Sequence, residues 1–131
     1  MGTRYLIDTC AVIKYLQESF PEKGLLFLDS VLDKECQISF ITKIELLAWK
    51  TQSEEGINIL SLFIKGSKIH YINEKIIEKA IEIRKQSNVK LPDAIIAATA
   101  ICNNFTLISD NDKDFKRLMG FGLTYLNPKD S

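Results

Sequence analysis

Short apolar runs alternate with amphipathic helical patterns along the chain, and this alternation restricts the fold more than any other feature. Residues 4–7, 36–40, 67–72, 106–109 and 123–126 resemble buried strands. Between them, apolar residues recur at helical spacing in the segments 11–18, 21–34, 42–50, 54–65, 73–87 and 92–103. Strands that follow one another through helices pair in parallel, because a parallel neighbour requires a crossover connection. The sequence therefore predicts an α/β fold, a parallel sheet of about four or five strands with helices on both faces.

Local signals set the ends of several helices. Pro21 suits the first turn of the second helix, and Gly66 ends the fourth. Asn73 is expected to cap the long helix that follows. Pro92 opens a helix that is apolar nearly all round, so we expect this helix to be buried.

Length and charge exclude several classes of protein. A chain of 131 residues suits one domain with one core, so we expect residues 1–131 to form a single domain. No apolar run has the length of a membrane span, and the short start before Tyr5 does not resemble a secretory signal, so a cytoplasmic protein is expected. The 17 Lys and Arg balance the 17 Asp and Glu, so a polyanionic partner would need a local basic patch.

The cysteines and the histidine exclude other chemistry. Cys10, Cys36 and Cys102 lie far apart in sequence, so they form neither a disulfide framework nor a CxxC metal site. We expect buried, reduced thiols, with Cys10 in the core of a helix. His70 is the only histidine and lies in a strand, which excludes a metal-free ribonuclease with two catalytic histidines. The chain also lacks a GxSxG motif and a P-loop.

Carboxylates occur where strands end and helices begin. Asp8 follows the first strand, Glu45 lies in the helix after the second, and Asp93 opens the buried helix. The run 110–114 follows the fourth strand. In open parallel sheets the site forms outside the carboxyl ends of the strands. Clustered carboxylates repel one another unless a cation neutralises them, and oxygen ligands without histidine or thiolate suit Mg²⁺ or Mn²⁺ rather than zinc.

Each acid also has a purely structural interpretation. Asp8 could cap the first helix, and Glu45 lies three residues after Thr42, the spacing of a capping box. Asp93 lies in a first turn, where negative charge favours the helix dipole. The run 110–114 could be a solvated turn with an N-cap. Only the joint placement of these acids favours a metal site.

Three segments together resemble the PIN domain, and within it the VapC-type toxin ribonucleases of bacterial and archaeal toxin–antitoxin pairs. They are LIDTCAVIKYL at residues 6–16, ITKIELLA at 41–48 and LPDAIIAATAICNNFTLISDNDKDF at 91–115. The resemblance covers nearly the whole chain in order and spacing. It implies an endoribonuclease that depends on Mg²⁺ or Mn²⁺, with Asp8, Glu45, Asp93 and Asp114 as its catalytic acids.

The last motif of the family commonly reads Thr, a variable residue, Asn or Asp, two variable residues, an acid and Phe. Position by position, Ser109 takes the place of the threonine, Asn111 that of the polar residue, and Asp114 precedes the phenylalanine. Serine for threonine is a mild departure. The extra acids Asp110 and Asp112 stay open as alternatives for the fourth acid.

The chemistry of phosphodiester hydrolysis fits this set of residues. Metal ions held by carboxylates can activate a water, neutralise the phosphate and stabilise the leaving oxygen. We expect Asp8 and Asp93 to hold the principal ion, directly or through water, and Asp114 to complete the site. Glu45 would orient the attacking water or hold a second ion. Thr9 would position a carboxylate or a substrate phosphate, or cap the first helix.

The resemblance further implies an RNA substrate, a cognate antitoxin and a homodimer. The helices at residues 21–34 and 54–65 carry apolar side chains that could serve a dimer face or an antitoxin groove. RNA phosphates could be held by Lys14, Lys43, Lys113, Lys116 and Arg117. Two alternatives remain open: a PIN nuclease of RNA processing or quality control, and a catalytically silent module that binds protein or RNA. A phosphatase or receiver domain is disfavoured because Asp8 lacks the DxDxT pattern.

Overall fold

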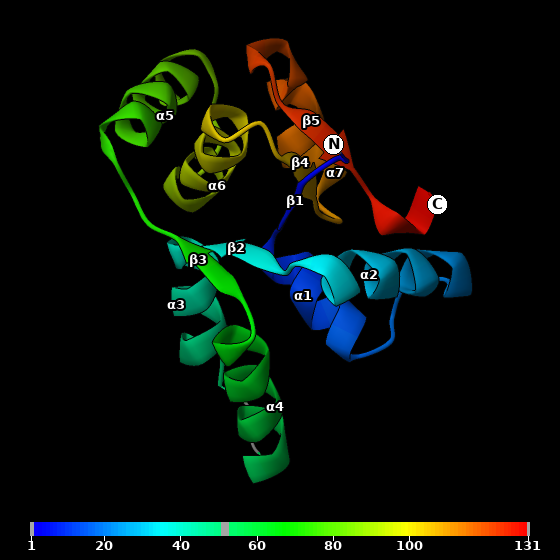
Figure 1. The fold of residues 1–131 in the computed structure, drawn as a ribbon. Coiled ribbons are helices and arrows are strands. Elements are labelled where there is room, and N and C mark those ends of the chain that lie inside the picture. The colour runs from blue at the N-terminus through cyan, green and yellow to red at the C-terminus, as the bar shows by residue number, and fades with distance from the viewer. Residues whose placement is uncertain (1, 51–52, 131) are drawn as a thin grey trace.

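The computed structural model describes residues 2–50 and 53–130, and within them strands and helices alternate as the sequence predicts (Figure 1). In chain order the elements are β1 (Tyr5–Ile7), α1 (Thr9–Leu16), α2 (Glu22–Lys34), β2 (Gln37–Ser39), α3 (Phe40–Ala48), α4 (Glu54–Lys65), β3 (Lys68–His70), α5 (Glu74–Gln86), α6 (Leu91–Cys102), β4 (Thr106–Ile108), α7 (Asp112–Phe115) and β5 (Thr124–Leu126). The 3₁₀ helices η1 (Lys116–Phe121) and η2 (Pro128–Asp130) flank β5.

All strand pairs that the structure describes are parallel. β1, β4 and β5 form one hydrogen-bonded sheet in the order β1-β4-β5, and β2 pairs with β3 in a second. Contacts between β1 and β2 bring the two sheets edge to edge, so the overall order is β3-β2-β1-β4-β5. From β1 the chain proceeds outward to β3 on one side, and β4 and β5 extend the sheet on the other. The strand order therefore reverses between β1 and β4, the position at which open α/β sheets form their sites.

The two faces of the sheet bury separate cores, because successive strand residues point to opposite faces. Leu6 and Leu107 face the core beneath α5 and α6. Ile7 and Ile108 face the core that α1 and α2 cover. Figure 1 shows these two pairs of helices on opposite sides of the strands. The prediction of helices on both faces of a parallel sheet is confirmed.

Most helix ends follow the local signals in the sequence. The side chain of Asn73 accepts a hydrogen bond of 3.0 Å from the backbone N–H of Ile76 and so caps α5, as predicted. The consecutive residues 94–100 of α6 are all buried, which confirms the expectation from its apolar composition. No helix among the described residues has the length and apolar character needed to cross a membrane.

The capping box proposed for Thr42 and Glu45 is wrong. The helix α3 begins at Phe40, directly after β2, and its N-cap is Ser39, whose Oγ accepts a hydrogen bond of 3.1 Å from the backbone N–H of Ile41. Thr42 is fully buried inside the helix. Because β2 passes into α3 without a loop, Ser39 is both the last residue of the strand and the cap of the helix.

The interpretation of residues 110–114 as a solvated turn is also incomplete. Asp112 begins the short helix α7, and the side chain of Asn111 caps it by accepting a hydrogen bond of 3.2 Å from the backbone N–H of Asp114. The chain continues through η1, in which Gly120 lies, up to Gly122 in the left-handed region at φ 99°. The acids of this segment are therefore held in a defined conformation.

Candidate metal and nuclease site

Asp8 lies where β1 ends, beside the end of β4. Its backbone N–H donates to the carbonyl oxygen of Ile108 at 2.9 Å, and Ser109 Oγ donates to its Oδ2 at 2.8 Å. The carboxylate makes no capping hydrogen bond to α1, although Asp8 occupies the N-cap position. With only 5% of its surface exposed, this acid is held across the switch point of the sheet.

Burial raises the pKa of Asp8, and hydrogen bonds from Ser109, Cys10 and the backbone N–H of Thr9 oppose that rise. The thiol of Cys10 lies 3.3 Å from Asp8 Oδ2 and 3.2 Å from Ser109 Oγ. The expectation of a thiol within a helix core is therefore wrong, since Cys10 borders the carboxylate and is partly exposed. Cys36 and Cys102 are free thiols as expected, but they too are partly exposed rather than buried.

Asp93 stands in the first turn of α6 and is half-buried. Its pKa rises to about 6, first because burial disfavours the charged form, and then because of the negative charges of Asp8, Asp114 and Glu45. A hydrogen bond with Asp114 raises it further. The other three acids singled out in the sequence thus lie close enough to Asp93 to act on its carboxyl group. The helix-dipole interpretation of Asp93 does not explain this gathering of like charges.

Asp114 is the partner that keeps its charge. Asn111 Nδ2 donates to its Oδ2 at 3.0 Å, and an Arg117 guanidinium nitrogen lies 3.2 Å from its Oδ1. The hydrogen bond from Asn111 holds its pKa below the usual range, with a further contribution from Arg117. Because the pKa of Asp93 is raised and that of Asp114 is lowered, Asp93 binds a proton more readily than Asp114 does.

Glu45 reaches the site from the middle of α3. Thr9 Oγ1 donates to its Oε1 at 2.6 Å, and the same hydroxyl lies 3.1 Å from Thr42 Oγ1. Glu45 is exposed, unlike Asp8, so its carboxylate faces solvent at the edge of the acidic group. Thr9, next to Asp8 in the chain, links the two acids.

Asp110 and Asp112 bind other partners. Burial raises the pKa of Asp110, but hydrogen bonds from Lys14 and Asn127 outweigh that effect and lower it. Hydrogen bonds from Asn127 and Tyr125 lower the pKa of Asp112 to about 2. Both acids are thereby engaged with Lys14, Tyr125 and Asn127, and neither contributes to the raised pKa of Asp93.

Asn127 and Tyr125 were not singled out in the sequence. Asn127 follows β5, and Tyr125 lies within it, so the rule that sites form at the carboxyl ends of parallel strands could have drawn attention to both. Nothing in their spacing from the acids indicated a contact, because the bonded residues lie 13 to 17 positions apart.

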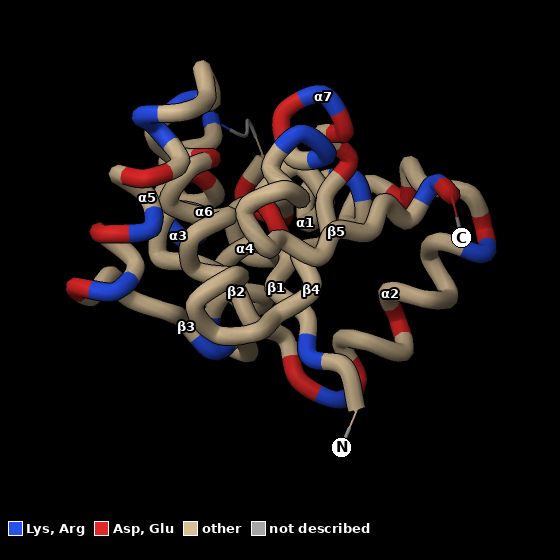
Figure 2. Tube along the Cα trace, turned by 90° about the horizontal axis from the view of Figure 1, so that it is seen from above, with Lys and Arg blue, Asp and Glu red and all other residues tan. Residues whose placement is uncertain are grey.

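The basic residues expected to hold RNA are partly engaged with the same acids. Lys14 pairs with Asp110, Lys116 lies 3.8 Å from Asp112, and Arg117 pairs with Asp114. Figure 2 shows acidic and basic positions alternating along α7. Lys113 is exposed and Lys43 is partly exposed, so both present charge near the acids.

The donor set fits a hard divalent cation. Carboxylates that raise the pKa of Asp93 by mutual repulsion would be relieved by a positive charge, and all of them offer oxygen ligands. Within residues 2–50 and 53–130, no three acidic, histidine or cysteine side chains converge closely enough to coordinate an ion by themselves. Mg²⁺ usually keeps several waters and takes one or two protein carboxylates, so it does not require three converging protein ligands.

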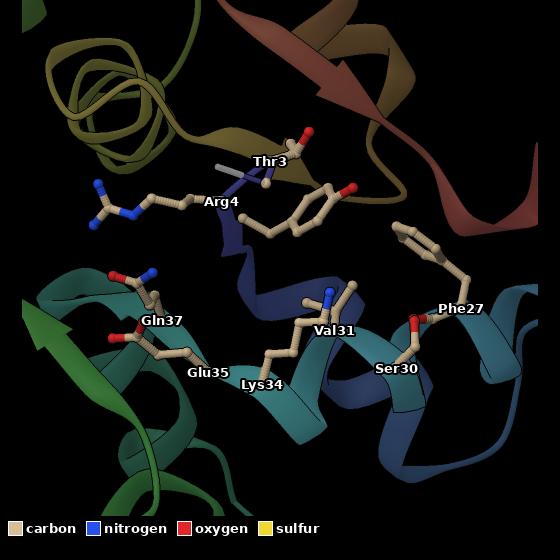
Figure 3. A pocket seen from close by; sticks show the side chains of 10 residues that line it. Thr3, Arg4, Phe27, Ser30, Val31, Lys34, Glu35 and Gln37 are labelled. Atoms are coloured by element: carbon tan, nitrogen blue, oxygen red, sulfur yellow. The ribbon is translucent and has the colours of Figure 1, made fainter.

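A cavity of about 410 Å³ lies at the opposite end of the strands (Figure 3). Arg4 and Tyr5 line it from β1 and the residues before it, and Lys34 lines it from the last turn of α2. None of the acids described above borders this cavity. The chemistry of the site therefore belongs to the carboxyl ends of the strands and not to this hollow.

Comparison with known proteins identifies relatives of the same fold. The chain is 32% identical to Ribonuclease VapC1 of Methanocaldococcus jannaschii over 126 residues, which cover 92% of this chain and 85% of that protein. The structure of VapBC-1 from nontypeable Haemophilus influenzae matches with a TM-score of 0.78 at 24% identity and covers 96% of this chain and 98% of that chain. A toxin–antitoxin complex from Klebsiella pneumoniae matches with a TM-score of 0.72 at 26% identity, over 95% of this chain and 97% of that one. The family model of the PIN domain matches residues 5–120, and the chain therefore belongs to the PIN-domain family.

Proposed function

We propose that this protein is an endoribonuclease that uses Mg²⁺ or Mn²⁺ and serves as the toxin of a toxin–antitoxin pair. The observation that carries the proposal is that Asp8, Glu45, Asp93 and Asp114 come from four separate segments of the chain and gather around one position, with the other three acids near enough to raise the pKa of Asp93. The similarity of this chain to Ribonuclease VapC1 supports the choice of RNA as the substrate.

The proposed ligands of the ion are Asp8, Asp93 and Asp114, directly or through water. When bound, a divalent cation supplies a Lewis acid for the phosphate and lowers the pKa of a coordinated water. Ser109 orients Asp8 through its hydrogen bond of 2.8 Å, and Asn111 orients Asp114 through one of 3.0 Å. Glu45, oriented by Thr9, is proposed to accept a hydrogen bond from the attacking water.

The basic side chains beside the acids are proposed to hold the RNA backbone. Lys113 on α7 and Lys43 on α3 lie on two of the elements that carry the acids. Each would neutralise a phosphate and keep the scissile bond near the carboxylates, which by themselves repel a polyanion.

The proposed partners are an antitoxin and a second copy of the chain. The Klebsiella pneumoniae relative is a toxin–antitoxin complex, which supports the first partner. The helices α3 and α4 leave large apolar side chains exposed, a surface suited to an amphipathic partner helix. These side chains are Ile44, Leu47, Ile57, Ile59 and Leu62, and the exposed Trp49 directly follows α3. A cytoplasmic location is part of the same proposal, because the RNA and the antitoxin would be met there.

Cleavage of a mixed RNA pool by the purified, antitoxin-free protein tests the function. Cutting is expected with Mg²⁺ or Mn²⁺ and should disappear in EDTA and in the Asp8→Asn variant. Cutting that persists in EDTA would contradict the metal-dependent mechanism. A folded protein that binds Mn²⁺ but cuts none of the pool would contradict a broad ribonuclease and favour a binding module.

Expression in cells tests the toxin role separately. Induction of the wild-type chain without an antitoxin should arrest growth, and induction of Asp8→Asn should not. Normal growth together with cleavage in the test tube would contradict the toxin role and favour a nuclease of RNA processing.

A further inference from the structure

Asn127 is buried at the end of β5 and has no place in the mechanism described so far. Its surface is 4% exposed, although asparagine is usually found at the surface. The next residue, Pro128, starts η2, so the backbone here is packed rather than free. A buried amide needs hydrogen-bond partners, and those of Asn127 lie in the acidic loop after β4.

One nitrogen of Asn127 joins two carboxylates. Its Nδ2 donates to Asp110 Oδ1 at 3.0 Å and to Asp112 Oδ1 at 3.0 Å. An amide nitrogen carries two hydrogen atoms, so it can make both bonds at once. Asn127 Oδ1 accepts a hydrogen bond of 3.0 Å from the backbone N–H of Lys129, which fixes the orientation of the amide group.

The loop that Asn127 holds carries three aspartates within five positions. Like charges this close repel one another, and the repulsion would open the loop unless donors or cations oppose it. Tyr125 Oη lies 2.6 Å from Asp112 Oδ1, and Lys129 Nζ lies 3.4 Å from its Oδ2. Asn127 is the one of these groups that binds both Asp110 and Asp112, so it sets the distance between them.

That distance determines where the loop delivers its functional side chains. Asp110 directly follows Ser109, which bonds to Asp8, and Asp112 is the first residue of the helix that carries Asp114. We propose that Asn127 is a positioning residue, which by clamping Asp110 and Asp112 holds Asp114 against Asp93. The inference rests on the proposed function for the cation that these acids bind.

Asparagine suits this position better than aspartate or serine. Aspartate has the same shape, but it would place a third carboxylate against the other two and remove both donors. Serine is shorter and has a single hydroxyl hydrogen, so it could keep at most one of the two bonds. Aspartate therefore adds repulsion to the loss of both bonds, and serine removes donors without adding a charge.

Mn²⁺ binding to the purified chain, measured by electron paramagnetic resonance without RNA, tests the proposal. Asn127→Asp should weaken Mn²⁺ affinity ~10-fold or more, because the loop that carries the proposed ligand Asp114 would lose its clamp and losses of this size are usual when groups behind the ligands of a metal site are removed. Asn127→Ser should show a smaller loss. Asn58→Asp is the matched control, because it makes the same charge change at an exposed site on α4 and should leave the affinity unchanged.

A charge swap separates positioning from general stability. Adding Asp112→Asn to Asn127→Asp restores an amide–carboxylate bond between positions 112 and 127 with donor and acceptor exchanged. The double variant should recover part of the lost Mn²⁺ affinity. Steady-state cleavage by Asn127→Asp should show a kcat that falls by a larger factor than KM rises, since only one of the two proposed RNA-binding lysines, Lys113, lies on the displaced loop, and Lys43 lies on α3.

Backbone amide resonances in EDTA give a readout without metal or activity. In Asn127→Asp they should shift for residues 111–115 and stay in place for α5. Unchanged Mn²⁺ affinity and unchanged loop resonances in a folded variant would overturn the inference, as would a loss that the charge swap fails to reduce. A wild-type chain that binds no Mn²⁺ would instead contradict the proposed function, and the loop resonances would then decide on the clamp alone.

Discussion

Ser109 Oγ donates a hydrogen bond of 2.8 Å to Asp8 Oδ2 and so joins two residues 101 positions apart in the chain. Both lie at the switch point of the sheet, one after β1 and one after β4. The carboxylate that receives this bond is almost wholly removed from water. A hydroxyl in this position does two things, since it stabilises the charged form of Asp8 and fixes the direction of its free lone pairs.

Ser109→Ala should therefore weaken metal binding and slow cleavage by ~10- to 100-fold, the range found when a partner of a metal ligand is lost. Loss of the donor would raise the pKa of Asp8 further, so the pH at which Mn²⁺ affinity falls should also move upward. Isothermal titration with Mn²⁺ at several pH values measures both effects.

Two controls accompany Ser109→Ala. Ser109→Thr keeps the hydroxyl that donates to Asp8, so it should behave like the wild type. Ser30→Ala removes an exposed hydroxyl that bonds only the carbonyl oxygen of Phe27 within α2, and it should change neither quantity. Wild-type Mn²⁺ affinity in Ser109→Ala would refute this role of the hydroxyl.

Asp93→Asn should abolish cleavage and yet stabilise the metal-free protein near neutral pH. The pKa of Asp93 is raised in the folded state from 3.8 to about 6, so its contribution to stability is full below about pH 4 and is lost as the pH rises through 6. Asparagine does not ionise, so the stability of the variant does not fall over this pH range on account of residue 93. Because the group is half exposed, we expect a gain of only about 1 kcal/mol at pH 7, or about 4 °C in Tm.

Thermal unfolding in EDTA at pH 4 and pH 7 checks whether the substitution stabilises the metal-free protein. The difference between Asp93→Asn and the wild type should be near zero at pH 4 and favour the variant at pH 7. Added Mg²⁺ should raise the Tm of the wild type more than that of the variant, since binding stabilises only the form that binds. A variant less stable than the wild type at pH 7 in EDTA would contradict the repulsion inferred at this site.

The three aspartates after β4 should differ sharply in cleavage. Asp114→Asn should lower the rate by more than ~100-fold, because Asp114 faces Asp93 and is a proposed ligand. Asp110→Asn and Asp112→Asn remove acids that already bind Lys14, Tyr125 and Asn127, so each should cost less than ~10-fold. Cleavage rates under single-turnover conditions compare the three variants directly. If Asp112→Asn were inactive and Asp114→Asn active, the fourth catalytic acid would be Asp112 and not Asp114.

Apolar periodicity accounts for how much of the fold could be predicted from the sequence. A segment such as α5 repeats its buried residues Ile76, Ala80 and Ile83 at helical spacing, and a polar cap precedes them, so pattern and structure agree. The helix α7 has four residues and one buried side chain, so it has no period to detect. Its conformation depends on the cap from Asn111 and on bonds from Tyr125 in β5 and from Asn127 directly after it, which lie 13 and 15 positions from Asp112.

The candidate site also has a part that the sequence predicts and a part that it does not. The acids could be named because several of them follow or precede elements whose ends meet at one edge of the sheet. The hydrogen bonds that give each acid its role could not, because they link side chains such as Thr9 and Glu45 over 36 positions. Their donors and acceptors have no fixed spacing, and only the folded chain brings them together.

Gly24→Ala and Gly120→Ala should change stability in opposite directions. A Cβ at Gly24 would overlap the carbonyl oxygen of Pro128, where α2 packs against η2, and backbone atoms yield less readily than side-chain ends. This overlap should destabilise the protein by more than the higher helix propensity of alanine stabilises it, so the free energy of unfolding should fall by about 1–2 kcal/mol. A Cβ at Gly120 meets nothing within 4 Å, so that substitution should be neutral or stabilise by up to ~1 kcal/mol through the unfolded state. Chemical denaturation in EDTA measures the free energy of unfolding of both variants. Equal stability of the two would show that η2 does not pack closely against α2 at Gly24.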